Sequence, residues 1–173
     1  MSNLANEVVQ SDIAELDELY WFINKKPNTK TRENIYVITM VSRNPRQIMG
    51  FDVASDKSPA RIQEIVDAAP DALLYCTDGW SGYVDVVYPS NHVRNICDKS
   101  NTFTVEGVNA DLRHYIPTPA RRSRCFARRL DTLYAVVKVF ALAYNRFGVA
   151  KHKYRQNQKR QSKELPFGVV DFL

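Results

Sequence analysis

Residues 72–79 read ALLYCTDG, and this short segment decides the expected fold. Its first six residues are mostly apolar and include no charged side chain, which is typical of a strand buried on both faces of a sheet. Asp78-Gly79 then forms a turn that ends the strand. Upstream, Ser58-Pro59 predicts the start of a helix, with Ser at the cap and Pro at the first helical position, and Pro70 ends it.

Three further strands are expected before this helix. They cover residues 12–24, 34–42 and 47–54, with polar turns between them. Such closely spaced strands form an antiparallel meander, whereas the strand–helix–strand passage ending at residues 72–77 adds a parallel neighbour. We therefore expect an α/β fold with a mixed sheet.

Downstream, residues 92–96 predict a short fifth strand, and helical periodicity runs from Glu106 until Pro117. A second apolar stripe at helical spacing covers residues 130–144 and is expected to face the core. We divide the chain into an N-terminal extension (1–11), one domain (12–150) and a basic C-terminal tail (151–173).

Composition bounds the class of protein. The 173 residues suit one domain, and a hydrophobic fraction of 45% excludes wholesale disorder. No apolar run reaches the roughly 18 residues of a membrane span, and the N-terminus carries acids where a secretory signal is basic and then apolar. Three cysteines, Cys76, Cys97 and Cys125, form neither a disulfide framework nor a zinc ribbon and read as incidental thiols. We expect a soluble, cytoplasmic domain.

Charge is distributed unevenly along the chain. Residues 1–112 carry 10 Lys and Arg against 16 Asp and Glu, whereas residues 113–173 carry 14 against 3. An acidic first part followed by a basic second part suggests a metal or catalytic site beside a surface that binds a polyanion. A basic solvated helix with a frayed tail is the alternative.

Three acids are candidates for chemistry: Asp17 in the first strand, Asp78 at the end of the fourth, and Glu106 near a helix start. If the first and fourth strands are neighbours, these carboxylates meet at one end of the sheet, where a divalent cation would offset their repulsion. Each also has a structural interpretation. Asp78 can open a turn, Glu106 can stabilise a helix N-terminus, and Asp17 can keep an edge strand soluble, as can Glu15 and Glu18.

Three blocks of sequence make the catalytic interpretation more specific. ELDELYWF (15–22), YCTDGWSGY (75–83) and TFTVEGVNADLRH (102–114) together resemble the DDE transposases of the insertion-sequence-one family. The resemblance covers about residues 12–148. It implies a ribonuclease H-like fold: a five-stranded mixed sheet, its first three strands antiparallel, with helices on both faces.

The resemblance also implies an activity and a site. The family uses Mg²⁺, or Mn²⁺, to cut double-stranded DNA at the ends of an element and to join the freed 3′-hydroxyl to target DNA, in an active complex expected to be a homo-oligomer. Asp17, Asp78 and Glu106 match the catalytic, metal-binding acids. Asn109 and Arg113 lie three and seven residues beyond Glu106, so they share its helical face and are expected to support the site.

Some features depart from the family. No CxxC pair or recognition helix precedes Asp17, whereas the family's full protein joins a zinc-ribbon and helix-turn-helix part to this one. Pro117 and Pro119 interrupt a stretch that is basic in relatives, and Ala127 stands where Ser is expected. Two alternatives follow: a non-catalytic DNA-binding remnant that modulates an intact transposase, and a structure-specific nuclease on the same fold.

Basic and aromatic residues extend the expected DNA surface. A dense arginine cluster is expected to contact the DNA backbone, its alternative being a solvated loop. Its members are Arg121, Arg122, Arg124, Arg128 and Arg129. Trp80 and Tyr83 are expected to pack the wall of the site, and the DNA-bound protein is expected at the nucleoid.

Overall fold

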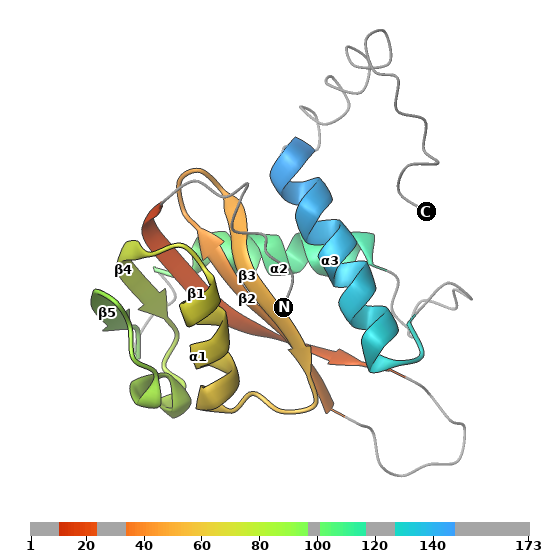
Figure 1. Cartoon of the computed structure of the whole chain (residues 1–173), viewed down its shortest axis with the longest axis horizontal. Helices are drawn as coiled ribbons and strands as arrows, with labels where there is room; N and C mark the ends of the chain where they lie inside the picture. Colours follow the sequence, from red (N-terminus) through yellow and green to blue (C-terminus); the bar gives the residue numbers. More distant parts are fainter. Residues whose placement is uncertain (1–10, 24–33, 97–100, 117–126, 148–173) are drawn as a thin grey trace, which may run out of the picture.

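The structure, a computed structural model, describes residues 11–23, 34–96, 101–116 and 127–147. Its centre is a five-stranded sheet in the order β3-β2-β1-β4-β5 (Figure 1). The strands are β1 (Ser11–Phe22), β2 (Asn34–Ser42), β3 (Gln47–Ala54), β4 (Ala72–Thr77) and β5 (Asn91–Arg94). The β1–β2 and β2–β3 pairs are antiparallel, whereas the β1–β4 and β4–β5 pairs are parallel. The expected mixed α/β sheet is confirmed.

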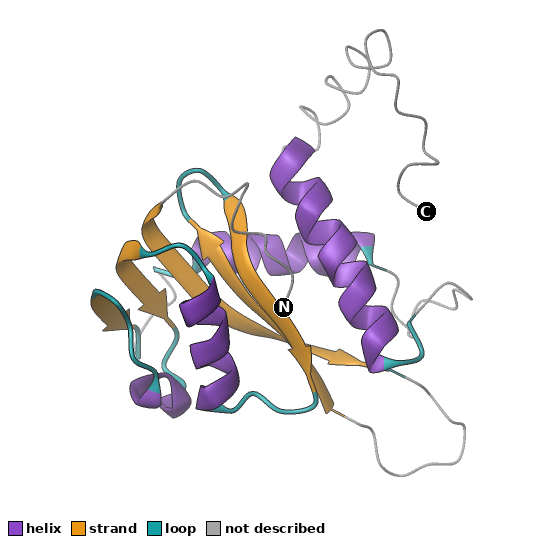
Figure 2. Ribbon diagram, in the orientation of Figure 1, coloured by secondary structure: helices purple, strands orange, loops and turns teal. Residues whose placement is uncertain are grey.

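Helices cover both faces of the sheet, as expected (Figure 2). On one face, α1 (Pro59–Ala68) packs Ile62, Ile65 and Val66 against Leu16 and other apolar side chains of the strands. On the other face lie α2 (Phe103–Tyr115) and α3 (Leu130–Phe147). A short 3₁₀ helix, η1 (Ser81–Asp85), follows β4 and was not expected. No helix in the described ranges is long and apolar enough to cross a membrane.

The side chains of β1 point alternately to the two faces of the sheet, so this strand contributes to the hydrophobic core on each face. Leu16 belongs to the cluster under α1, whereas Leu19 and Trp21 belong to the cluster under α2 and α3. Successive side chains of a strand point to opposite faces, so a strand with apolar residues of both parities must be covered twice. β1 is the central strand of the sheet, and Glu15 pairs with both β2 and β4, so the edge-strand interpretation of Glu15 is wrong. Asp17 and Glu18 lie beyond the last β1 residue that pairs with β4, so at these two positions β1 has β2 as its sheet neighbour on one side only.

The start of α2 differs from expectation. The periodicity placed it at Glu106, but the helix begins at Phe103, three residues earlier. Its local cap is weak, since Thr102 occupies the N-cap position without a side-chain cap bond. The helix start is instead stabilised from a distant part of the chain.

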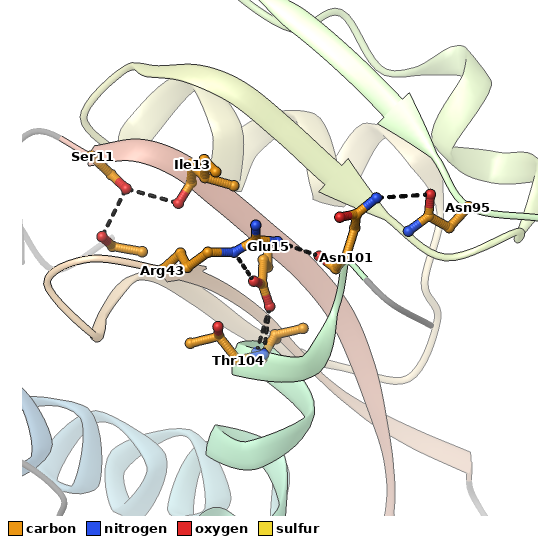
Figure 3. Close-up of polar contacts among 9 residues, drawn as sticks. Ser11, Ile13, Glu15, Arg43, Asn95, Asn101 and Thr104 are labelled. Atoms are coloured by element: carbon orange, nitrogen blue, oxygen red, sulfur yellow. Dashed lines mark hydrogen bonds and ion pairs between the residues drawn. The ribbon is translucent and has the colours of Figure 1, made fainter. Parts of the chain in front are cut away.

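That distant group is the carboxylate of Glu15, whose side chain is fully buried in β1 (Figure 3). Its Oε2 accepts the backbone N–H groups of Thr104 and Val105, at 2.7 and 2.9 Å. Its Oε1 accepts Nε of Arg43 at 2.7 Å, and Arg43 also donates to the carbonyl of Asn101. A negative charge at a helix N-terminus satisfies otherwise unpaired N–H groups and interacts favourably with the helix dipole. Glu15 thus fixes α2 on the central strand.

We predict that Glu15→Ala lowers the free energy of unfolding by about 3–5 kcal/mol, because it leaves Arg43 and two helix N–H groups without their shared acceptor. Glu15→Gln, which keeps an acceptor oxygen but no charge, should lose less. Urea unfolding followed by circular dichroism measures both. Glu64→Ala, at an exposed position on α1, is the control and should change stability by less than about 0.5 kcal/mol. A Glu15→Ala protein as stable as this control would contradict the capping role.

Candidate metal centre

The site lies where two parallel strands stop running together. β4 pairs with β1 from Ala72 to Thr77, and its last residue lies opposite Leu16. β1 continues to Phe22 with β2 on its other side. Ligand sites in open α/β sheets form at such carboxyl ends of neighbouring strands. Asp17 follows Leu16 in β1, and Asp78 follows Thr77 at the end of β4, so these two residues meet at this point.

Asp17, Glu18 and Asp78 each offer a carboxylate oxygen, and these oxygens all lie within 4.8 Å of one another. All three side chains are partly buried. The structure thus brings together two of the three expected acids and adds a third, Glu18, that the sequence interpretation had assigned to solubility. Like charges this close repel, and partial burial weakens screening by water, so the cluster favours a bound cation.

Asp17 is held from the α2 side. Nδ2 of Asn109 donates to Oδ2 of Asp17 at 2.9 Å, and Oδ1 of Asn109 accepts the hydroxyl of Thr39 at the same distance. Burial raises the pKa of Asp17, the Asn109 hydrogen bond lowers it, and the charges of Asp78 and Glu106 raise it further. Asn109, itself buried, therefore orients Asp17 and partly offsets the cost of its charge.

Glu18 approaches the cluster from the α1 side. Its side chain is 5% exposed, and its Oε2 forms an ion pair with Nζ of Lys57 at 3.5 Å. Its Oε1 is buried without a well-formed hydrogen bond, as is the nearby hydroxyl of Tyr83. Burial raises the pKa of Glu18, Lys57 and Tyr83 lower it, and Asp78 and Asp17 raise it. The sequence did not predict Glu18 as a member of the acidic cluster, because neighbouring residues of a strand are expected to point to opposite faces of the sheet.

Asp78 forms the expected turn and also lies in the acidic cluster. Its Oδ1 accepts the backbone N–H of Trp80 at 2.9 Å, the arrangement of an Asx turn. The same side chain belongs to the acidic cluster. Trp80 and Tyr83 pack edge to face beside it, with ring centroids 5.4 Å apart. Burial and the three acids raise the pKa of Tyr83 well above its ordinary value.

Glu106 and Arg113 lie farther along α2. Glu106 is partly buried in the first turn, and its charge acts on Asp17, but it is not among the three acids within 4.8 Å. Its role as a ligand stays a prediction. Arg113 and His114 are exposed, about two turns beyond Glu106.

Most of the arginine cluster cannot be placed. Arg121, Arg122 and Arg124, with Pro117, Pro119, Cys97 and Cys125, lie outside the described residues. Arg128 and Arg129 are exposed just before α3. Arg129 is paired with Asp131 at 2.7 Å, which offsets its charge. Cys76, the third cysteine, is buried in β4, consistent with an incidental thiol.

The donor set indicates which cation fits. The three acids offer only oxygen ligands, and none of the described His or Cys side chains joins them. All-oxygen shells suit hard cations such as Mg²⁺ and Mn²⁺, whereas zinc prefers sites that include nitrogen or sulfur. The buried Oε1 of Glu18, which has no well-formed hydrogen bond, is a group that a cation could satisfy.

The chain matches no protein-family model and no curated protein.

We predict that Asp17→Asn stabilises the metal-free protein at neutral pH. The folded-state pKa of Asp17 lies above its ordinary value of 3.8, so ionising Asp17 costs folding free energy. This cost is full above the folded-state pKa and disappears as the pH falls below 3.8. The stability gap between variant and parent should therefore close on acidification.

Urea unfolding in the presence of a chelator, repeated over a pH series, measures this gap. Asp12→Asn, which makes the same change at an exposed position of the same strand, is the matched control. A gap that widens as the pH falls would contradict the assigned burial of Asp17.

Proposed function

We propose that this domain is the catalytic part of a DNA transposase, which cuts DNA at the ends of an element and joins the freed 3′-hydroxyl to target DNA. The observation that carries the proposal is the meeting of the Asp17 and Asp78 carboxylates where β1 and β4 part. Two acids contributed by adjacent parallel strands are suited to metal-dependent phosphoryl transfer. The three sequence blocks that resemble insertion-sequence-one transposases contain Asp17, Asp78 and Glu106.

We further propose that the fold is ribonuclease H-like. The strand order β3-β2-β1-β4-β5, the antiparallel first three strands and the helices on both faces are compatible with it. The crossover through α1 returns the chain to the far side of β1, which is what makes β4 its parallel neighbour. Without that crossover, Asp17 and Asp78 would not meet.

In this mechanism Asp17 and Asp78 would hold Mg²⁺ or Mn²⁺, with Glu106 as the expected third ligand. A divalent cation bound there would supply charge neutralisation and activate water or a 3′-hydroxyl for in-line displacement. Asn109 keeps Asp17 oriented, and its 2.9 Å hydrogen bond favours the ionised carboxylate against the effect of burial. Arg113, exposed farther along α2, is available to a DNA phosphate. In the active complex, two or more copies would engage the element ends and the target.

We predict that Asp17→Asn and Asp78→Asn each reduce cleavage and joining by at least about a hundredfold, a loss typical of removing one essential electrostatic group. Both variants should bind DNA as well as the parent or better, because a negative charge near phosphate is removed. The assay incubates the protein with Mg²⁺, labelled element ends and a plasmid target. Asp85→Asn, at an exposed acid of η1 outside the cluster, is the control.

The products of this assay separate the alternatives. Joined products support the transposase, cleavage without joining indicates a nuclease, and DNA binding without either indicates a remnant. Full activity of Asp17→Asn would contradict the catalytic assignment altogether.

We also predict that DNA binding comes mainly from phosphate contacts by the basic part of the chain, residues 113–163. If about five arginines each neutralise a phosphate, log K against log salt should have a slope of about −4 to −5. Replacing Arg121, Arg122 and Arg124 with Ala should flatten that slope by about 3 and weaken all duplexes alike. Fluorescence anisotropy over a salt series measures it. An unchanged slope would mean that these residues form a solvated loop.

A further inference from the structure

A positively charged side chain, Lys57, lies beside the acidic cluster. Lys57 lies just before α1, and its Nζ is 3.5 Å from Oε2 of Glu18. The same Nζ lies 4.2 Å from the centroid of the Trp80 ring and 5.8 Å from that of Tyr36. An ammonium between an aromatic face and a carboxylate is held by both charge and cation–π attraction. These contacts hold the Lys57 ammonium next to Glu18.

Glu18 is only half satisfied by this lysine. Its side chain is 5% exposed, yet Oε1 has no well-formed hydrogen bond, and the facing hydroxyl of Tyr83 is likewise buried without one. A buried carboxylate oxygen whose only hydrogen bond is poorly formed is costly, so a better-placed partner would stabilise it. A carboxylate oxygen of Glu18 lies within 4.8 Å of oxygens of Asp17 and Asp78, so a cation shared by the three acids would be that partner.

We infer that Glu18 is an additional ligand to the divalent cation, and that Lys57 is an internal counter-cation that competes with the divalent cation for Glu18. This inference rests on the metal site of the proposed function and adds to it a ligand and a control on occupancy. Without a divalent cation, Lys57 partly neutralises the cluster. When a divalent cation binds, the Lys57 ammonium loses its hold on Glu18 and becomes available to a phosphate of the DNA.

The juxtaposition has a geometric origin. Asp17 is held from the α2 face and Glu18 from the α1 face, as the strand alternation requires. Their oxygens still converge because β4 has ended opposite Leu16, where Asp78 turns away from the sheet. The site therefore joins both faces around an open edge, and Lys57 reaches it from the face opposite to Asn109.

The test is a titration of Mn²⁺ into the purified full chain without DNA, with free Mn²⁺ followed by electron paramagnetic resonance. Glu18→Gln should weaken Mn²⁺ binding by at least about tenfold. Lys57→Met, which keeps an aliphatic chain but removes the charge, should tighten it by at least about threefold, and Lys57→Arg should not. Glu64→Gln and Lys138→Met, which make the same changes of charge on α1 and α3, are the controls.

The double variant Glu18→Gln with Lys57→Met decides whether the lysine acts through the glutamate. If it does, Lys57→Met has no effect once Glu18 is gone. An equal tightening in both backgrounds would show a general field effect and overturn the competition. Unchanged Mn²⁺ affinity in Glu18→Gln would overturn the ligand assignment. Circular dichroism of each metal-free variant identifies any that fail to fold, in which case the Lys57→Met and Lys57→Arg pair still decides the role of Lys57.

The same titration separates this inference from the proposed function. Mn²⁺ binding that depends on Asp17 and Asp78 but not on Glu18 overturns the inference alone. Binding that depends on all three acids in a protein that neither cuts nor joins DNA overturns the proposed function alone. No Mn²⁺ binding by the parent chain at millimolar concentration overturns both.

Discussion

The contact on which the arrangement of the site depends is the buried carboxylate of Glu15 at the start of α2. A second contact, from Asn109 to Asp17, joins the same helix to the same strand. Glu15 and Asp17 are two residues apart, about 7 Å along a strand, and Val105 and Asn109 are one helical turn apart, about 6 Å along the axis. Both contacts join α2 to β1, and Glu106 lies between Val105 and Asn109 in that helix.

Most strands and helices could be predicted from the sequence, because their positions are set by residues within or next to each element. The apolar runs of β2, β3 and β4 are bounded by turn residues, and the structure places these strands at the expected residues. Ser58-Pro59 marks the start of α1 correctly, although the Ser58 side chain forms no cap bond. The start of α2 could not be predicted, since Glu15 lies almost ninety residues earlier in the chain. Residues 101–106 carry no sequence signal that the N-terminus of α2 is capped by a side chain of β1.

Two of the three acids in the cluster could be predicted from the sequence, and the third could not. The meeting of Asp17 and Asp78 follows from the parallel pairing of β1 with β4. The sequence predicted this meeting only on the condition that the first and fourth strands are neighbours, and the structure meets that condition. Glu18 did not follow, because alternation assigns it to the opposite face from Asp17. That rule holds inside a sheet, where neighbouring strands keep the two faces apart. It loses force where β4 ends, and there the two side chains reach a common point.

The energetics of the cluster argue that these acids serve something other than folding. Burial raises the pKa of both Asp17 and Glu18, so each is ionised at a cost. Glu15 shows how the same fold treats a structural carboxylate: two backbone N–H groups and Arg43 satisfy it fully. Glu18, on the adjacent part of the strand, keeps a buried oxygen without a well-formed hydrogen bond and one long ion pair. Incomplete satisfaction of this kind concentrates at functional sites, where a ligand completes what the protein leaves open.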